Sequence, residues 1–224
     1  MLIEPMGHAQ FLLTNRYGDT VLTDPFDRET GYPWETVTCD VVTVSHSHHD
    51  HADLSKCRGR EGNPIVIDRE GWHSPLPDVT VQAVPTFHDD CGGQKRGRNL
   101  MMLIEMDGLR LLHCGDLGHL LPEETIASLG RVDVLLIPVG GFFTLSPEDA
   151  ARTVEAIHPR VTVPMHYRTA YNASWPIETA EPFLDLMGAT EAEREPMPML
   201  RVTAGDLSQQ KRICVLEAKQ GKKQ

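Results

Sequence analysis

A run of ligand-type side chains that directly follows a hydrophobic segment is the feature that most constrains this chain. Residues 40–45 (DVVTVS) are rich in β-branched side chains and predict a buried strand, and the chain continues as HSHHDH. Residues two apart in an extended segment point to the same side, so His46 and His48 converge there. The turn that follows can direct Asp50 and His51 into the same space. A polar surface loop would leave this gathering of imidazoles and carboxylate unexplained, so we interpret the run as a metal-binding motif.

The hydrophobic pattern around this motif predicts a mixed α/β chain. Strands are expected at 9–14, 20–23, 64–67, 79–84, 100–106, 109–114, 133–138, 161–165, 199–203 and 212–217, and helices at 122–129, 147–157 and 178–187. The Asp107-Gly108 pair is the strongest turn signal. Because no repeat or Pro/Gly-rich linker divides the sequence, we predict one layered α/β domain over residues 1–224, with a frayed end at 219–224.

Charge and composition argue against several classes of protein. The 224 residues carry 21 Lys and Arg against 32 Asp and Glu, a net charge of −11, and a nucleic-acid-binding protein needs a basic face. No segment approaches the roughly 20 apolar residues of a membrane helix, and the start lacks the basic region of a signal peptide. We therefore expect a cytoplasmic protein without a membrane span. The odd number of cysteines, which lack CxxC spacing, predicts free thiols at Cys39, Cys57, Cys91, Cys114 and Cys214.

The run at 46–51 resembles the metal motif of the metallo-β-lactamase superfamily, and further landmarks of that superfamily follow in its order. They are His88 in VPTFH, Asp116 in HCGDLGH and His166 in VPMHY, together with Gly7-His8-Ala9 and Thr23-Asp24-Pro25 near the start. The combination is similar to the branch that contains the ascorbate-6-phosphate lactonases and the N-acylphosphatidylethanolamine phospholipases D. The resemblance spans roughly residues 7–170, and little beyond Tyr171 matches.

The resemblance implies a four-layer αββα sandwich with the metals at the edge where the loops gather. It assigns His46, His48 and His88 to a first metal and Asp50, His51 and His166 to a second, and Asp116 would bridge the two. Imidazole and carboxylate ligands without cysteine suit two divalent transition metals, with Zn²⁺ as the first choice and Mn²⁺ or Fe²⁺ as alternatives. Three protein ligands and a bridge leave positions open, as catalysis requires.

The expected mechanism uses a metal-bound hydroxide, which Asp50 and Asp116 would orient and whose proton either could relay. Asp24 would support a metal-binding histidine through its second ring nitrogen, or would be a turn aspartate. His8 would line the pocket as a polarising group, or would be a buried histidine bonded to backbone. His119 would act as a general acid or substrate contact, or would be a surface histidine at a helix start.

Three arginines flank the predicted ligands in this acidic chain. Arg96 and Arg98 follow His88, and Arg168 follows His166 by two residues. They would bind an anionic group of the substrate, since the guanidinium group suits phosphate and carboxylate, or they belong to solvated loops.

The sequence thus predicts a metal-dependent hydrolase that acts on a small, anionic ester, lactone or phosphodiester. The alternatives on the same fold are an iron-dependent oxidoreductase and a nuclease-type phosphodiesterase. The acidic charge and the lack of room for a large inserted domain disfavour the nuclease. A small-molecule substrate is the expected partner. Neither its identity nor the oligomeric state follows from the sequence, because specificity resides in loop shapes.

Overall fold

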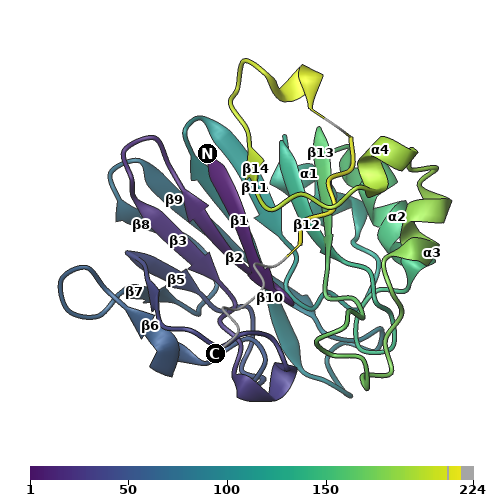
Figure 1. Cartoon of the computed structure of the whole chain (residues 1–224), viewed down its shortest axis with the longest axis horizontal. Helices are drawn as coiled ribbons and strands as arrows, with labels where there is room; N and C mark the ends of the chain where they lie inside the picture. Colours follow the sequence, from purple (N-terminus) through teal and green to yellow (C-terminus); the bar gives the residue numbers. More distant parts are fainter. Residues whose placement is uncertain (211, 218–224) are drawn as a thin grey trace.

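Two six-stranded β-sheets packed face to face form the centre of the computed structural model, which describes residues 1–210 and 212–217 (Figure 1). The first sheet has the strand order β14 (Leu200–Arg201), β1 (Leu2–Gly7), β2 (Gln10–Thr14), β3 (Thr20–Thr23), β5 (Val41–Thr43) and β7 (Ile65–Ile67). The second has the order β13 (Val161–Met165), β12 (Val134–Pro138), β11 (Leu109–His113), β10 (Arg98–Met106), β9 (Val79–Phe87) and β8 (Gly71–Leu76). The main hydrophobic core contains buried side chains of both sheets.

The two outer layers differ in their structure. The helices are α1 (Glu123–Leu129), α2 (Pro147–Ile157), α3 (Glu181–Leu186) and α4 (Glu191–Arg194), and α2 packs against β12 and α3. A separate apolar cluster with Leu22 and Val42 covers the other side of the first sheet. There the described chain forms the strand pair β4 (Val37–Thr38) and β6 (Cys57–Arg58) and the 3₁₀ turns η1 (Arg28–Thr30) and η2 (Leu54–Lys56). The predicted layered order is therefore present, with an outer layer of short turns and strands in place of an α-helix on this side.

All predicted ligands follow strands that run in the same direction. Strands β1 and β3 are both antiparallel to β2, and β5 is parallel to β3. In the second sheet β9 and β11 are both antiparallel to β10, and β13 continues the direction of β11 through β12. The carboxyl ends of these strands consequently meet at one edge of the sandwich. The side chains that follow them are His8, Asp24, His46, His48, Asp50, His51, His88, Asp116 and His166.

Several predicted elements are confirmed, and others need correction. The Asp107-Gly108 turn joins β10 to β11, and Ser146 caps α2 by accepting a hydrogen bond from the amide of Asp149. The predicted helix at 178–187 is shorter, at Glu181–Leu186, and helix α4 was not predicted. The predicted strand at 212–217 is wrong, because this segment makes only isolated bridges through Ile213 and Leu216. The predicted frayed end at 219–224 lies outside the described residues.

Four strands were not predicted, namely β1, β4, β6 and β8, and two of them, β1 and β8, contain a proline. Pro5 lies in β1, which pairs with β2 and β14, and Pro75 lies in β8 at the edge of the second sheet. Proline lacks a backbone donor, so its presence argues against a strand unless the strand is at an edge or irregular. Both strands have register shifts, at Pro5/Gly7 and at His73/Leu76. Within the described residues, no helix is long and apolar enough to span a membrane.

Lys56 is a cation inside the otherwise apolar region below the first sheet. Its side chain is only 1% exposed, and its Nζ donates hydrogen bonds to Gln10 Oε1 at 3.0 Å and to the Phe26 carbonyl at 3.1 Å. The ammonium also lies 3.6 Å from the centre of the Phe26 ring. Burial lowers the pKa of Lys56 from 10.5 to about 8, against the opposing charge of Asp53. Lys56 thereby holds the loop that follows Asp24.

This lowered pKa predicts a pH-dependent term in the stability. Between about pH 8 and 10.5 the unfolded chain holds a proton on Lys56 that the folded chain has released, so stability rises with pH there. The unfolding free energy of the wild type, minus that of Lys56→Met, should rise by about 2 kcal/mol across this window, allowing for solvent screening. Below pH 8 this difference should not change with pH. Urea denaturation at a series of pH values measures it. Lys95→Met, at an exposed lysine paired with Asp90, should show no such rise.

Candidate metal centre

A first histidine group brings together three ligand nitrogens within 4.8 Å of one another. Its members are His46, His48 and His88. The Nε2 atom of His46 lies 2.9 Å from the Nδ1 atom of His48. Burial, together with the charge of His51, lowers the pKa of His46 to about 3, and burial also lowers that of His48. Both imidazoles are therefore neutral at pH 7 and available to bind a cation. The structure thus brings together the residues predicted for the first metal.

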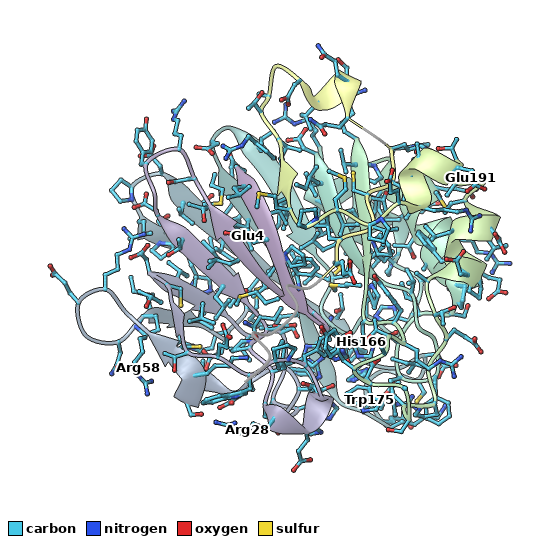
Figure 2. All side chains as sticks on the ribbon, viewed as in Figure 1. Glu4, Arg28, Arg58, His166, Trp175 and Glu191 are labelled. Carbon is cyan, nitrogen blue, oxygen red and sulfur yellow. The ribbon has the colours of Figure 1, made fainter. Side chains whose placement is uncertain are left out.

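A second group gathers on the other side of Asp116 and contains His8, Asp50, His51 and His166, again within 4.8 Å. His166 has a left-handed backbone with φ 51°, and its amide donates a hydrogen bond to the His8 carbonyl. Figure 2 shows His166 and Trp175 at the same end of the molecule, below the sheets. Three of the four are the residues predicted for the second metal, and His8 is an addition.

Asp116 lies between the two groups. Its Oδ2 atom is 3.1 Å from Nε2 of His88 and 3.2 Å from Nε2 of His166, and its Oδ1 atom is 3.1 Å from Nε2 of His51. Burial opposes ionisation of this carboxyl group, but the charges of His166 and His51 outweigh it and hold its pKa well below the usual range. One carboxylate oxygen thus faces histidines of both groups, which is the position that a bridging ligand requires.

Unpartnered buried atoms indicate that these side chains fit a metal. His51 Nε2 and Asp116 Oδ1 are buried without a hydrogen-bond partner, although they face each other. Burial lowers the pKa of His51, but the charges of Asp116 and Asp50 raise it well above its ordinary value. The site therefore attracts positive charge, which a divalent cation would supply. Imidazoles and carboxylates, with no cysteine in either group, are ligands that suit Zn²⁺, Mn²⁺ or Fe²⁺.

Asp24 contacts His51 at the ring nitrogen Nδ1. Its Oδ2 atom lies 2.8 Å from Nδ1 of His51 and accepts a hydrogen bond from the Ser45 hydroxyl at 2.6 Å, while Oδ1 accepts one from the Ser45 amide at 2.8 Å. Asp24 is fully buried, and its φ of 38° is unusual for a residue with a side chain. A carboxylate that accepts from Nδ1 leaves Nε2 of His51 free to face the metal site.

A cavity of about 580 Å³ opens onto both groups. His48, Asp50, His88, Asp116 and His166 line one part of it, and Phe143, Trp175 and Arg96 line another. Neither aromatic residue was predicted, because each lies in a loop without periodicity and only the fold brings it to the site. Two polar supports, which lie at the ends of strands, were also missed. Ser45 lies 2.9 Å from Nδ1 of His46, and the side chain of Asn99 accepts a hydrogen bond from the Asp116 amide.

The three predicted arginines separate in the structure. Arg96 lines the cavity at the metal site, donates a hydrogen bond to the Phe142 carbonyl at 3.0 Å and lies 5.7 Å from the centre of the Phe143 ring. Arg98 lines an adjoining groove that also contains His46 and His48. Arg168 is exposed and lines neither of these spaces. Of the three, Arg96 and Arg98 therefore line spaces that predicted ligands also line.

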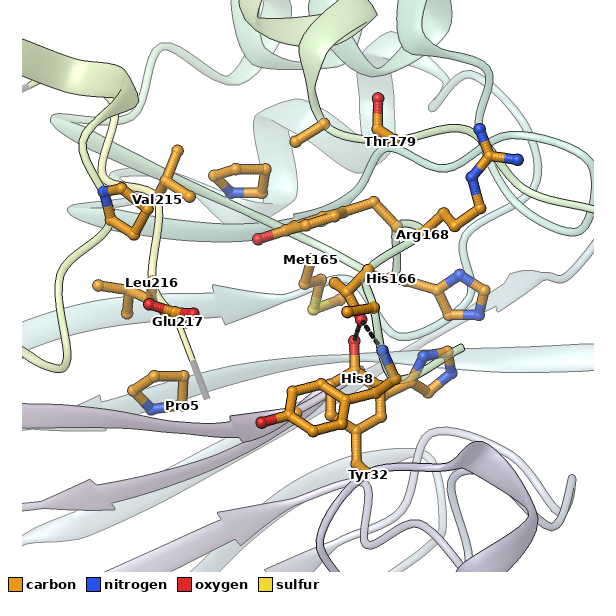
Figure 3. Close-up of a pocket in the computed structure, with 18 of the residues that line it drawn as sticks. Pro5, His8, Tyr32, Met165, His166, Arg168, Thr179, Val215, Leu216 and Glu217 are labelled. Atoms are coloured by element: carbon orange, nitrogen blue, oxygen red, sulfur yellow. Dashed lines mark hydrogen bonds between the residues drawn. The ribbon is translucent and has the colours of Figure 1, made fainter. Parts of the chain in front are cut away.

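Arg168 lies instead on a second cavity of about 380 Å³ behind His8 and His166. Figure 3 shows Arg168 at one end of this cavity, with its guanidinium group directed away from His8. His8 does not line the cavity at the metal site, so its predicted role as a polarising group is not supported. Its Nε2 atom lies 3.1 Å from Oδ2 of Asp50, and burial, with the charge of His166, lowers its pKa to about 4. It orients Asp50.

His119 has a different position from the predicted one at the pocket mouth. Its Nδ1 atom donates to the Leu120 carbonyl at 2.8 Å, and its Nε2 atom accepts a hydrogen bond from the Phe87 amide at 3.2 Å. Both ring nitrogens are bonded to backbone and the side chain is absent from the cavity lining, so His119 is not placed as the general acid or substrate contact that the sequence suggested. It fixes the end of β9 just before His88.

Comparisons with known proteins agree with this geometry. Residues 2–166 match the family described as “Beta-lactamase superfamily domain”. A UPF0173 metal-dependent hydrolase from Thermococcus onnurineus is 31% identical, with 82% of this chain and 90% of that protein covered. A crystal structure from Thermotoga maritima, assigned to the Zn-dependent hydrolases of the metallo-beta-lactamase superfamily, has a TM-score of 0.75 at 34% identity and covers 97% of this chain and 99% of that one. An isothiocyanate hydrolase from Delia radicum gut bacteria shares the fold alone. Its TM-score is 0.67 at 15% identity, and the match covers 91% of this chain and all of that one.

Proposed function

The chain belongs to the metallo-β-lactamase superfamily and to its UPF0173 metal-dependent hydrolases, and from this membership we propose a hydrolase with two divalent metals that acts on a small anionic ester, lactone or phosphodiester. The observation that carries the proposal is the single cavity onto which both histidine groups and Asp116 open. His46, His48 and His88 would hold one metal, and Asp50, His51 and His166 the other, with Asp116 between them. Zinc is the first choice, and manganese or iron are alternatives.

Bound divalent metals would make hydroxide available near neutral pH and would polarise the carbonyl or phosphoryl oxygen under attack. The chain's own contribution is to hold the ligands rigidly and to move the proton. Asp50 suits the second task because it lines the cavity and His8 holds its Oδ2 atom. Burial raises the pKa of Asp50, but the charge of His51 and the bond to His8 outweigh this and lower it. Asp50 is therefore an ionised acceptor beside the reaction site, whereas histidines surround Asp116.

The walls of the cavity support a substrate that is partly apolar and carries a negative charge. Phe143 and Trp175 lie with ring centres 6.4 Å apart and offer apolar surface beside the ligands, with the Trp175 ring 6.4 Å from that of His166. Arg96 is half-buried beside them, and the Phe142 carbonyl fixes its direction. Because the net charge of −11 repels anions at long range, an anionic substrate needs such a local cation. A guanidinium group binds phosphate or carboxylate through two parallel hydrogen bonds.

Arg96→Ala should therefore raise KM for a phosphorylated or carboxylated substrate by about tenfold to a hundredfold, with the metals retained, because a charge-assisted hydrogen bond contributes about 1.5–3 kcal/mol. KM for the neutral analogue of the same substrate should change little. Arg168→Ala is the matched control, because Arg168 lies on the other cavity. Steady-state kinetics on charged and neutral analogues measure the effect. Equal changes for both analogues would contradict an anionic substrate.

Removal of the metals tests the proposed function itself. Dialysis of the purified protein against a chelator should abolish hydrolysis in a screen of lactones, phosphodiesters and carboxylesters, and Zn²⁺, Mn²⁺ or Fe²⁺ should restore it to different extents. Elemental analysis should find up to two transition metals per chain after growth in metal-replete medium. Protein that contains no metal and keeps its activity with the chelator would refute the proposal, and a single tightly bound metal would refute only the dinuclear part.

A further inference from the structure

Phe142 has an unusual backbone conformation for its residue type. In the described part of the chain six residues other than glycine have a positive φ, and five of them are His or Asp. Those two residue types are enriched in this left-handed region, whereas a bulky side chain is an outlier there. Phe142, with φ 53°, is the outlier. Glycine would adopt the same backbone without a steric penalty, so local conformation does not account for a phenylalanine at this position.

The ring of Phe142 adds little to the stability of the free protein. Its side chain is 63% exposed, and its ring centre lies 4.7 Å from that of Phe143 in a T-shaped arrangement. Hydrophobic stabilisation is roughly proportional to the apolar area that is removed from water, so a ring left mostly in water contributes little of it. The free protein therefore has a strained backbone at Phe142 and gains little from the side chain, which is typical of a residue that contacts a ligand.

The turn that carries Phe142 is held beside the cavity at the metal site. Gly140 packs so closely against His166 that a Cβ atom on this glycine would lie 2.3 Å from the His166 carbonyl oxygen. Two residues later, the Phe142 carbonyl accepts a hydrogen bond from Nη2 of Arg96 at 3.0 Å. Arg96 and Phe143 both line the cavity. Phe142, which follows one of them in contact and the other in sequence, is therefore fixed next to the space that a substrate would occupy.

Arg96 and the two phenylalanine rings place a cation next to apolar surface. The guanidinium carbon of Arg96 lies 5.7 Å from the centre of the Phe143 ring. The Arg96 side chain makes no ion pair within residues 1–210 and 212–217, and its bond to the Phe142 carbonyl uses one of five N–H donors. The other donors can bind an anion, whose neighbouring atoms would then lie against the rings. A ligand that fits both features carries its anionic group next to a compact apolar group.

We propose that Phe142 is a specificity-determining residue, whose ring covers the apolar group of a substrate that Arg96 holds by its negative charge. The substrate class is then a small aryl ester or aryl phosphodiester that carries its charge next to the aromatic ring. This class rests on the proposed hydrolase function. The contact between Phe142 and an aromatic anion does not, because it can be measured as binding without any hydrolysis.

Binding of two matched probes to the full chain tests this contact. Phenylphosphonate and methylphosphonate carry the same anionic group, which Arg96 or a bound metal attracts in both, and they differ only in the apolar group. Isothermal titration calorimetry of the wild type should give the lower Kd for phenylphosphonate. Phe142→Ala should raise this Kd about threefold to tenfold, the factor that an aromatic contact contributes, and should leave the Kd of methylphosphonate unchanged.

Tyr17→Ala is the matched control. Tyr17 is 61% exposed and lies against the guanidinium group of Arg16, as Phe142 lies near that of Arg96. It belongs to the turn between β2 and β3, at the opposite edge of the first sheet from the predicted ligands. The Kd values of both probes should therefore equal those of the wild type.

Urea denaturation separates this role from a structural one. Phe142→Ala should unfold at the urea concentration of the wild type, and Phe142→Gly should not fall below Phe142→Ala, because glycine adopts a positive φ without strain. A clearly lower midpoint for Phe142→Ala would mean that the ring supports the fold and would overturn the proposal. So would a wild type that does not prefer phenylphosphonate, or a Kd for this probe that Phe142→Ala leaves unchanged. A change in that Kd without hydrolysis of any ester would refute the hydrolase and leave the contact at Phe142 standing.

Discussion

Asp116→Ala should lose metal from both proposed sites and lower kcat/KM by at least about a thousandfold, because bound metals would supply several kcal/mol of transition-state stabilisation. The physical reason is the position of one carboxylate oxygen near both His88 and His166, with the other near His51. Without this negative charge, the histidines of the two groups would have to hold two cations with no anion between them. Elemental analysis of protein purified from metal-replete cells, together with steady-state kinetics, measures the loss.

His166→Ala provides the comparison, because this histidine belongs to the second group alone. It should lose less metal than Asp116→Ala and should keep the metal of the first histidine group. His49→Ala is the matched control inside the same motif, since its side chain is exposed and pairs with Asp27. This variant should retain the metal content of the wild type. Equal losses in Asp116→Ala and His166→Ala would argue against a bridging carboxylate.

Asp24→Asn should lower the unfolding free energy by about 3 kcal/mol and weaken metal binding by about tenfold to a hundredfold. Two donors of Ser45 and Nδ1 of His51 converge on the two carboxylate oxygens of Asp24. An amide of the same size would turn a donor toward one of them and leave buried groups unpaired. His51 would also lose the partner that fixes its proton on Nδ1. Denaturation and metal titration of the same preparations measure the two effects.

Asp27→Asn is the control for this second prediction. Asp27 lies three residues further along the same loop, but its partner His49 is exposed. Both stability and metal affinity should stay close to the wild-type values, since exposed ion pairs contribute at most about 1 kcal/mol. A loss of stability in Asp24→Asn without weaker metal binding would mean that Asp24 acts on the fold alone and does not position His51.

The candidate ligands at 46–51 could be recognised in the sequence because the alternation of side chains along a strand depends only on neighbouring residues. A β-branched segment that ends in HSHHDH places its histidines at a strand end whatever the rest of the chain does. The helix at 147–157 and the Asp107-Gly108 turn were predictable for the same reason, because an N-cap and a turn involve only neighbouring residues. The strands with Pro5 and Pro75 were not, since pairing with distant strands outweighs their weak local preference.

What only the tertiary structure decided is which of the flanking residues face the ligands. Arg168 is two residues from a predicted ligand in the sequence and Arg96 is eight, yet only Arg96 lines the cavity at the metal site. Both ring nitrogens of His119 are bonded to backbone groups. Trp175 and Phe143 have no sequence signal and reach the site through loops that the two sheets bring together. The physical reason is that the metal motif depends on the alternation of side chains along one strand. A substrate cavity is specified by the packing of segments more than a hundred residues apart, for which the sequence holds no local rule.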